Sequence, residues 1–116
     1  MAPEDRNEPG GAGVNGFPGW RAGAATATFS IPDGTPMAGY AAREGHSTGA
    51  LDELTVSCLA LEADGERFAL IAIDLIGVDA EMTEAIAAAT DLKPEAVALC
   101  ASHTHSGPAG VVKRLH

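Results

Sequence analysis

Two histidines two positions apart, His103 and His105, are the residues of this chain best suited to chemistry. They follow an apolar run and precede a Gly107-Pro108 turn signal. In an extended backbone, residues i and i+2 point to the same side, so both imidazoles are expected to face one pocket. Imidazole nitrogens bind zinc readily and also transfer protons. The spacing therefore predicts a metal site or an acid–base pair. Two loop histidines, one bonded to a backbone carbonyl, are the structural alternative.

Asp74 is a second candidate, because it ends an otherwise apolar run. A carboxylate there is costly to bury unless it is paired, hydrogen-bonded or near a metal. It is interpreted either as a group that orients a ligand histidine or as a cap for the turn near Gly77. The hydroxyls of Ser102, Thr104 and Ser106 lack the GxSxG setting of a nucleophile, which favours hydrogen-bonded loop hydroxyls.

The other histidines and the cysteines carry weaker signals. His46 is interpreted as a surface histidine, and His116 is assigned no role. Cys58 and Cys100 lie in apolar runs without CxxC spacing, which favours buried free thiols. A disulfide between adjacent strands stays open, because connectivity does not follow from sequence.

Strands are expected to position these residues. Small and β-branched residues predict strands over 24–31 and 54–62. Asp64-Gly65 predicts a tight turn into the next strand. A nearly continuous apolar run over 67–75 predicts a central strand buried on both faces.

A helix is expected next, over 79–90, where acids in the first turn suit the helix dipole. Pro94 marks its end, and 95–101 predicts a further strand. The face of the helix that packs on the sheet is expected to carry Met82, Ile86 and Ala89. The fold class is therefore α/β: a mixed layered sheet with at least one strand–helix–strand unit. A right-handed crossover makes its two strands parallel and places the site loop at a strand C-terminal end.

Composition limits the fold and the partners. The chain has 116 residues, 46% of them apolar but only 4% aromatic, and much of the apolar share is alanine. We therefore expect a thin core unless another segment or chain completes it. The net charge of −9 disfavours binding to nucleic acids, whose phosphates need a basic surface, and docking to anionic membranes.

The N-terminal segment, residues 1–23, is rich in Gly, Pro, Asn and charge, which predicts a flexible arm. It shows no secretory signal, so a cytoplasmic location is expected, with secretion left open if the N-terminus is incomplete. No apolar stretch is long enough to span a bilayer.

Four segments together resemble the N-terminal region of the neutral/alkaline (non-lysosomal) ceramidase family. The specific element is Ser102–Gly110, and Met37–Ala41 supports it at the right distance upstream. Phe29–Pro32 and Ile73–Gly77 add weaker support. The resemblance extends from about Ala24 to Gly110.

The resemblance implies a zinc-dependent amidase that hydrolyses the N-acyl bond of ceramide or a related N-acyl lipid. It implies that His103 is a zinc ligand and that His105 belongs to the same active site, as a further ligand and as the catalytic residue. Gly107 and Gly110 would let backbone approach the metal or substrate, and Gly39 and Tyr40 would shape the floor of the site.

The family's remaining ligands, a second distant His, a Glu and a Tyr, lie well downstream of this region. We therefore expect residues 24–116 to be an N-terminal part of a ceramidase-like catalytic domain. A C-terminal portion or a second chain would then supply the other ligands. Two alternatives stay open: a non-catalytic metal- or partner-binding module, and a metallohydrolase that acts on a smaller amide or ester.

Overall fold

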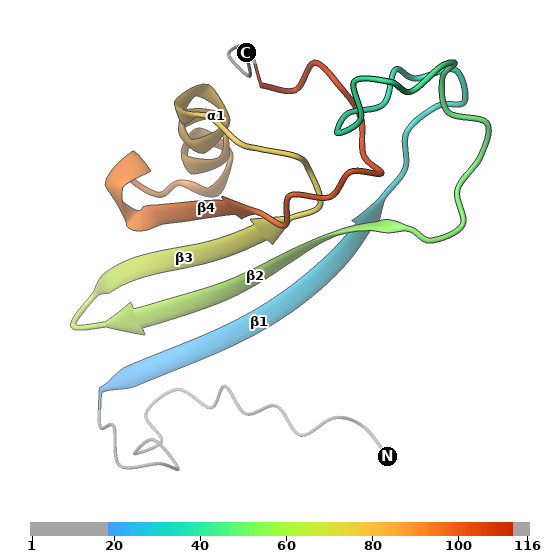
Figure 1. Cartoon of the computed structure of the whole chain (residues 1–116). Coiled ribbons are helices and arrows are strands. Elements are labelled where there is room, and N and C mark those ends of the chain that lie inside the picture. Colours follow the sequence, from blue (N-terminus) through green and yellow to red (C-terminus); the bar gives the residue numbers. More distant parts are fainter. Residues whose placement is uncertain (1–18, 113–116) are drawn as a thin grey trace, which may run out of the picture.

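A four-stranded sheet with one helix on one face forms the body of the protein (Figure 1). The structure, a computed structural model, describes residues 19–112. The strands are β1 (Trp20–Phe29), β2 (Leu54–Ala63), β3 (Glu66–Ile73) and β4 (Val97–Ala101), in that order across the sheet. Helix α1 (Ala80–Thr90) and a 3-10 turn, η1 (Pro94–Ala96), connect β3 to β4. The predicted α/β fold is confirmed.

The sheet is mixed, as expected. The pairs β1–β2 and β2–β3 are antiparallel, whereas β3 and β4 are parallel. The turn between β2 and β3 has positive φ at both Asp64 (51°) and Gly65 (76°), the conformation that a two-residue hairpin needs. The parallel pair then requires the crossover that α1 provides.

The start of the first strand differs from the prediction. β1 begins at Trp20, so the last residues of the expected arm belong to the sheet. The reason is tertiary: β2 is ten residues long and pairs along its whole length, from Phe29↔Leu54 to Trp20↔Ala63. Residues 1–18 of the expected arm lie outside the described residues.

Helix α1 begins and ends at side-chain and backbone caps. Asp79 is the N-cap, and its carboxylate accepts a bond of 3.0 Å from the backbone N–H of Met82. Asp91 ends the helix in the left-handed region, with φ of 55°. The prediction for the packing face is wrong at Ala89, which is exposed, because the helix turns Ala87 toward the sheet with 1% of its surface exposed.

The core is thin, as the alanine content predicts. Ala69, Ile71, Ala87 and Val97 form a cluster between α1 and the strands beneath it, and Leu75, just after β3, is buried as well. Cys58 is half-buried against this core, but Cys100 is exposed, and both thiols are free. The expectation of a buried thiol is therefore wrong at Cys100, whose register partner Ala72 points away from α1.

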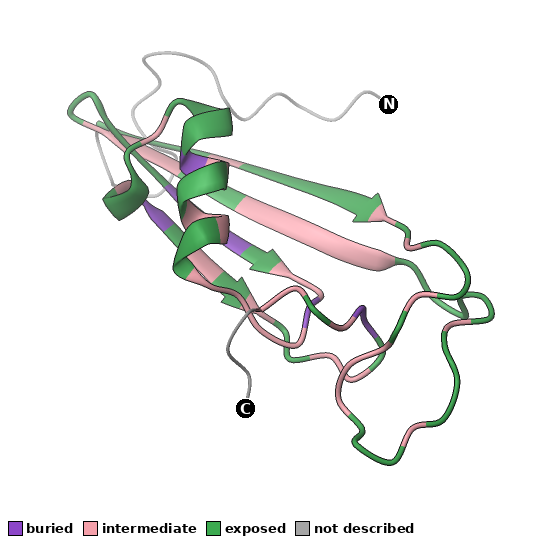
Figure 2. Ribbon diagram, turned by 90° about the horizontal axis from the view of Figure 1, so that it is seen from above, coloured by how far each residue is buried: buried purple, intermediate pink, exposed green. Residues whose placement is uncertain are grey.

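The prediction that the third strand is buried on both faces is wrong. Ala69 and Ile71 of β3 are buried, but the alternating Phe68 and Leu70 are 45% and 48% exposed. The reason is that α1 covers only one face of the sheet (Figure 2). An apolar run alone does not say how many layers cover it.

No helix among residues 19–112 is long and apolar enough to cross a membrane.

We expect Asp79→Ala to lower the free energy of unfolding by about 1 kcal/mol, because the Met82 N–H loses its acceptor. Urea denaturation followed by circular dichroism measures this change. The matched control is Glu84→Ala, which removes the same charge from an exposed helix position and should stay within about 0.5 kcal/mol. Equal losses would contradict the capping role.

Candidate functional site

The two histidines lie where the parallel pair of strands ends. After β4, the backbone N–H of Ser102 donates to the carbonyl of Ile73, and that of His103 donates to Leu75, each at 3.0 Å. These bonds extend the β3–β4 pairing beyond both strands. The predicted position of the site, at the C-terminal end of a strand, is therefore confirmed for His103.

The backbone at His103 is not extended, contrary to the expectation from the i, i+2 spacing. His103 has φ of 65°, in the left-handed region, so the chain turns there. The two imidazoles nevertheless lie side by side, with ring centroids 4.9 Å apart and an interplanar angle of 76°. His103 is exposed and His105 is half-buried. A turn at His103, rather than an extended strand, therefore brings the two rings together.

The ring of His103 is oriented by a backbone carbonyl. Its Nδ1 lies 2.8 Å from the carbonyl oxygen of Ile76. Because a carbonyl only accepts, Nδ1 carries the hydrogen and donates it, which leaves Nε2 available for a metal ion or a proton. Metal-binding histidines commonly have this arrangement. It also matches the structural alternative, in which a loop histidine is bonded to a carbonyl.

The segment around Gly39 and Tyr40 packs directly against His105. A Cβ added to Gly39, which has φ of 106°, would lie 2.6 Å from the His105 side chain. The rings of Tyr40 and His105 meet edge to face, with centroids 5.2 Å apart. An isolated antiparallel bridge between Met37 and Pro108 joins the two segments. The two best motifs of the sequence, Met37–Ala41 and Ser102–Gly110, therefore form one structural unit.

Asp74 has a role that neither interpretation of the sequence predicted. Its Oδ2 accepts bonds from the backbone N–H of Thr55 at 2.8 Å and from the Thr55 hydroxyl at 2.9 Å. These bonds, with one from the Ser102 hydroxyl, hold the pKa of the Asp74 carboxyl below its usual range. Asp74 thus ties the end of β3 to the start of β2, instead of orienting a histidine or capping the turn near Gly77.

The remaining candidates lie apart from the histidine pair or make local bonds. His46 is exposed, as expected, and His116 lies outside the described residues. The Thr104 hydroxyl accepts a bond from the backbone N–H of Ser106, which agrees with the interpretation as loop hydroxyls. Within residues 19–112, no three His, Cys, Asp or Glu side chains come together as a complete metal site.

A cavity of about 650 Å³ lies beside the segment Ser102–Gly110, here called the histidine block. Its lining carries polar side chains, namely the hydroxyl residues Ser30, Ser102, Thr104 and Ser106 and the carboxylates Asp33, Asp52, Glu53 and Asp74. It also carries apolar side chains, namely Phe29, Ile31, Met37, Leu51 and Leu54. The volume falls within the range typical of small-molecule sites.

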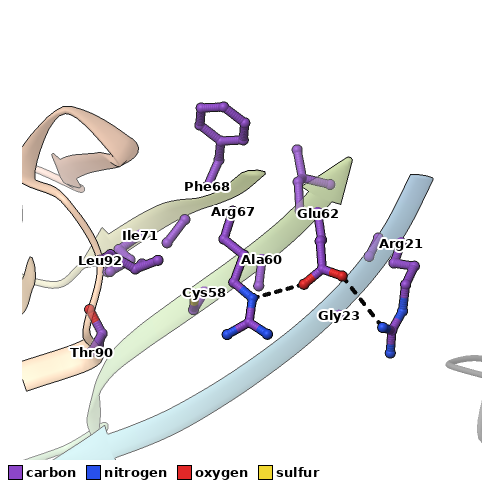
Figure 3. A pocket seen from close by; sticks show the side chains of 13 residues that line it. Arg21, Gly23, Cys58, Ala60, Glu62, Arg67, Phe68, Ile71, Thr90 and Leu92 are labelled. Atoms are coloured by element: carbon purple, nitrogen blue, oxygen red, sulfur yellow. Dashed lines mark hydrogen bonds and ion pairs between the residues drawn. The ribbon is translucent and has the colours of Figure 1, made fainter. Parts of the chain in front are cut away.

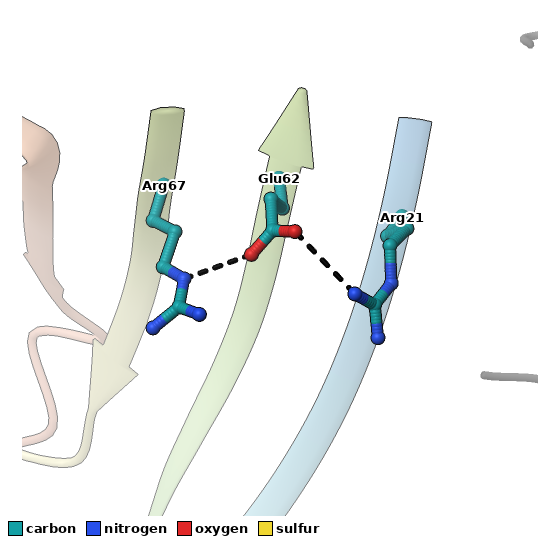
Figure 4. A network of polar contacts seen from close by, with 3 residues as sticks. All are labelled: Arg21, Glu62 and Arg67. Carbon is teal, nitrogen blue, oxygen red and sulfur yellow. Dashed lines mark hydrogen bonds and ion pairs between the residues drawn. The ribbon is translucent and has the colours of Figure 1, made fainter. Parts of the chain in front are cut away.

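A second cavity, of about 390 Å³, lies over the other end of β2 and β3 (Figure 3). At its edge, Glu62 accepts bonds from Arg67 at 2.8 Å and Arg21 at 3.4 Å (Figure 4). The bond from Arg67 is the main reason why the pKa of Glu62 is lowered. Such exposed ion pairs stabilise a fold only weakly. Neither this cavity nor the larger one is lined by His103 or His105.

Comparison with known proteins gives a clear structural match. No protein-family model and no curated protein sequence matches the chain. The crystal structure of neutral ceramidase from Pseudomonas aeruginosa superposes with a TM-score of 0.67 and 26% identity over 78% of this chain. The chain has a neutral ceramidase-like fold. A ceramidase complexed with C2 matches similarly, with a TM-score of 0.64 and 25% identity over 78% of the chain.

This chain covers 16% of the length of each of those ceramidase chains. The similarity confirms the resemblance that the sequence motifs indicated. The roles of His103 and His105 within the ceramidase-like fold stay predictions.

We expect Gly39→Ala to displace His105, because the new Cβ would overlap its side chain. Gly34→Ala is the matched control: Gly34 also has positive φ, 84°, but a Cβ added there would meet nothing within 4 Å. Urea denaturation should show a loss for Gly39→Ala that exceeds that of the control by about 1–3 kcal/mol. The imidazole NMR signals of His105 should shift in Gly39→Ala alone. Equal losses and unshifted signals would contradict the close packing.

We expect Asp74→Asn to lower the free energy of unfolding by about 1–2 kcal/mol at pH 7, because the carboxylate is the stronger acceptor. Since the folded-state pKa of Asp74 is lowered, its contribution is present above the unfolded pKa of about 4 and is lost as the pH falls through the folded value. Urea unfolding between pH 7 and pH 2.5 should therefore show the two chains converging in acid. Asp33→Asn, at an exposed position, is the control, and a pH-independent difference would contradict the assignment.

Proposed function

We propose that this chain supplies the His103–His105 part of a zinc-dependent amidase site of the ceramidase type. The substrate would be ceramide or a related N-acyl lipid. The observation that carries the proposal is the orientation of His103, whose Nδ1 donates to the Ile76 carbonyl and whose ring lies 4.9 Å, between centroids, from that of His105. The ceramidase-like fold supports the substrate class.

The spacing of the two rings suits a shared zinc ion. Two imidazoles on one tetrahedral zinc, with Zn–N bonds of about 2 Å, have centroids roughly 5 Å apart. The observed separation is 4.9 Å. A catalytic zinc site needs three protein ligands, and the described residues bring two histidines together. The proposal therefore requires at least one further donor from outside residues 19–112.

Hydrolysis of an N-acyl bond adds water to the carbonyl carbon and breaks the C–N bond, which releases a carboxylic acid and an amine. A zinc ion supplies Lewis acidity, which polarises the carbonyl and makes water a stronger nucleophile near neutral pH. His103, fixed by Ile76, would hold the ion. His105 would act as a second ligand or would move a proton between water and the leaving nitrogen.

The cavity beside the block supports an amphiphilic substrate. Its hydroxyl residues, such as Ser102 and Thr104, would contact the amide and hydroxyl groups of a lipid, and its apolar residues, such as Phe29 and Leu54, would contact hydrocarbon. A smaller amide would leave these apolar side chains exposed to water. This mixed lining supports the lipid substrate over a small amide or ester.

A non-catalytic zinc-binding module is the second candidate. It is favoured by the pairing of only two histidines within the described residues. This candidate predicts that the chain, completed by its further zinc ligands, binds zinc but hydrolyses no N-acyl amide.

The test is zinc affinity, measured by competition with a chelator. We expect His103→Ala to weaken binding by more than about 100-fold, because the loss of a ligand exceeds the 10–100-fold effect of losing an orienting partner. His105→Ala should weaken it similarly if His105 is a ligand, and should affect only hydrolysis if it moves a proton. His46→Ala, an exposed histidine, is the control and should leave the affinity unchanged.

Equal losses in His103→Ala and His46→Ala would contradict the proposal. Hydrolysis of long-chain and short-chain N-acyl amides by the zinc-loaded protein separates the candidate functions. Faster cleavage of long chains supports the ceramidase type, and faster cleavage of short chains supports a metallohydrolase for smaller substrates. Zinc binding with no cleavage supports the module.

A further inference from the structure

Arg43 joins the two segments that form the site. Its Nη2 donates a bond of 2.7 Å to the backbone carbonyl of His105, although the two residues are 62 positions apart in the chain. Its own position is set locally, since its backbone N–H donates to the carbonyl of Tyr40 at 3.1 Å. The side chain is half-buried. Neither the composition nor the motifs of the sequence singled this residue out.

The guanidinium of Arg43 also contacts the aromatic ring beside it. Its central carbon lies 5.2 Å from the centroid of Tyr40, within the range of a cation–π contact. Tyr40 in turn meets the ring of His105 edge to face. Arg43 therefore supports His105 twice, directly at its carbonyl and indirectly through Tyr40.

The choice of partner distinguishes Arg43 from the other described arginines. Arg21 and Arg67 both pair with the carboxylate of Glu62 on the exposed sheet surface. Arg43 instead donates to a main-chain oxygen, in an acidic chain with 16 Asp and Glu residues. A charge-assisted bond to a carbonyl fixes backbone position, and a planar guanidinium can donate and stack at the same time.

The backbone at this point needs such support. His103 adopts φ of 65°, which a residue with a side chain adopts only when its surroundings hold it there. From one side, the N–H and Nδ1 of His103 are bonded to Leu75 and Ile76. From the other side, two residues further on, the carbonyl of His105 is held by Arg43.

We propose that Arg43 is a positioning residue for the histidine pair. By anchoring the His105 carbonyl and the Tyr40 ring, it sets the separation and relative orientation of the two imidazoles. Its hydrogen bond goes to the main-chain carbonyl of His105, so it acts through the position of that residue. The link to zinc rests on the proposed function, but the positioning of the rings does not.

The first test needs no metal. Arg43→Met keeps the length of the side chain and removes the donors, and Arg67→Met, on the exposed surface, is the charge-matched control. Nuclear Overhauser contacts between the His103 and His105 ring protons report their separation directly. We expect these contacts to be lost or strongly weakened in Arg43→Met and unchanged in Arg67→Met. Unchanged contacts in Arg43→Met would overturn the proposal.

The second test is zinc affinity, with Co²⁺ absorption as a spectroscopic measure of ligand geometry. We expect Arg43→Met to weaken zinc binding by about 10–100-fold and to alter the Co²⁺ spectrum, as the loss of an orienting partner does. Arg43→Lys keeps the charge but loses the planar fork, so its affinity should lie nearer to Arg43→Met than to the parent chain. Full rescue by lysine would overturn positioning in favour of a simple charge effect.

The two tests separate the proposals. If His103→Ala changes zinc affinity no more than His46→Ala does, while Arg43→Met still loses the ring contacts, the proposed function fails and the positioning role stands. If zinc binds and the contacts survive in Arg43→Met, the positioning role fails alone. Should Arg43→Met not fold, Arg43→Lys carries the ring-contact test, because it retains the charge and the aliphatic stem.

Discussion

The parallel pairing of β3 with β4 is the constraint on which the site depends. It places the segment after β3 beside the segment after β4, so that the carbonyls of Leu75 and Ile76 meet the backbone and ring of His103. Because parallel strands need a crossover, α1 is required for this arrangement as well. The helix thus serves the site without contributing a side chain to it.

A second set of contacts closes the site from the other side. The segment that follows β1 returns to the histidine block through the Met37–Pro108 bridge, the close approach of Gly39 and the bond from Arg43. Asp74 completes the frame by tying β3 to Thr55 at the start of β2. Residues distant in the chain therefore converge where the strands β3 and β4 end, and most of them fix the position of the segment that carries the histidines.

The same sheet shows how little of this fold is held by a conventional core. Four small or medium side chains are buried under α1, while Phe68 and Leu70 on the opposite face of β3 remain about half exposed. Hydrogen-bonded pairing along ten-residue strands, rather than layered packing, accounts for the length of β1 and β2. Substitutions at the helix cap Asp79, or at Gly39 where the backbone lies close to His105, should therefore lower the free energy of unfolding.

The sequence by itself determined the order of the elements, the hairpin at Asp64 and the strand–helix–strand unit, because these follow from local periodicity and turn chemistry. It also determined the resemblance to ceramidases, because the motif around His103 is contiguous. Only the tertiary structure decided the exposed face of β3, the partners of Asp74 and the role of Arg43. Each of these depends on which distant segment lies opposite a residue, and local patterns do not contain that information.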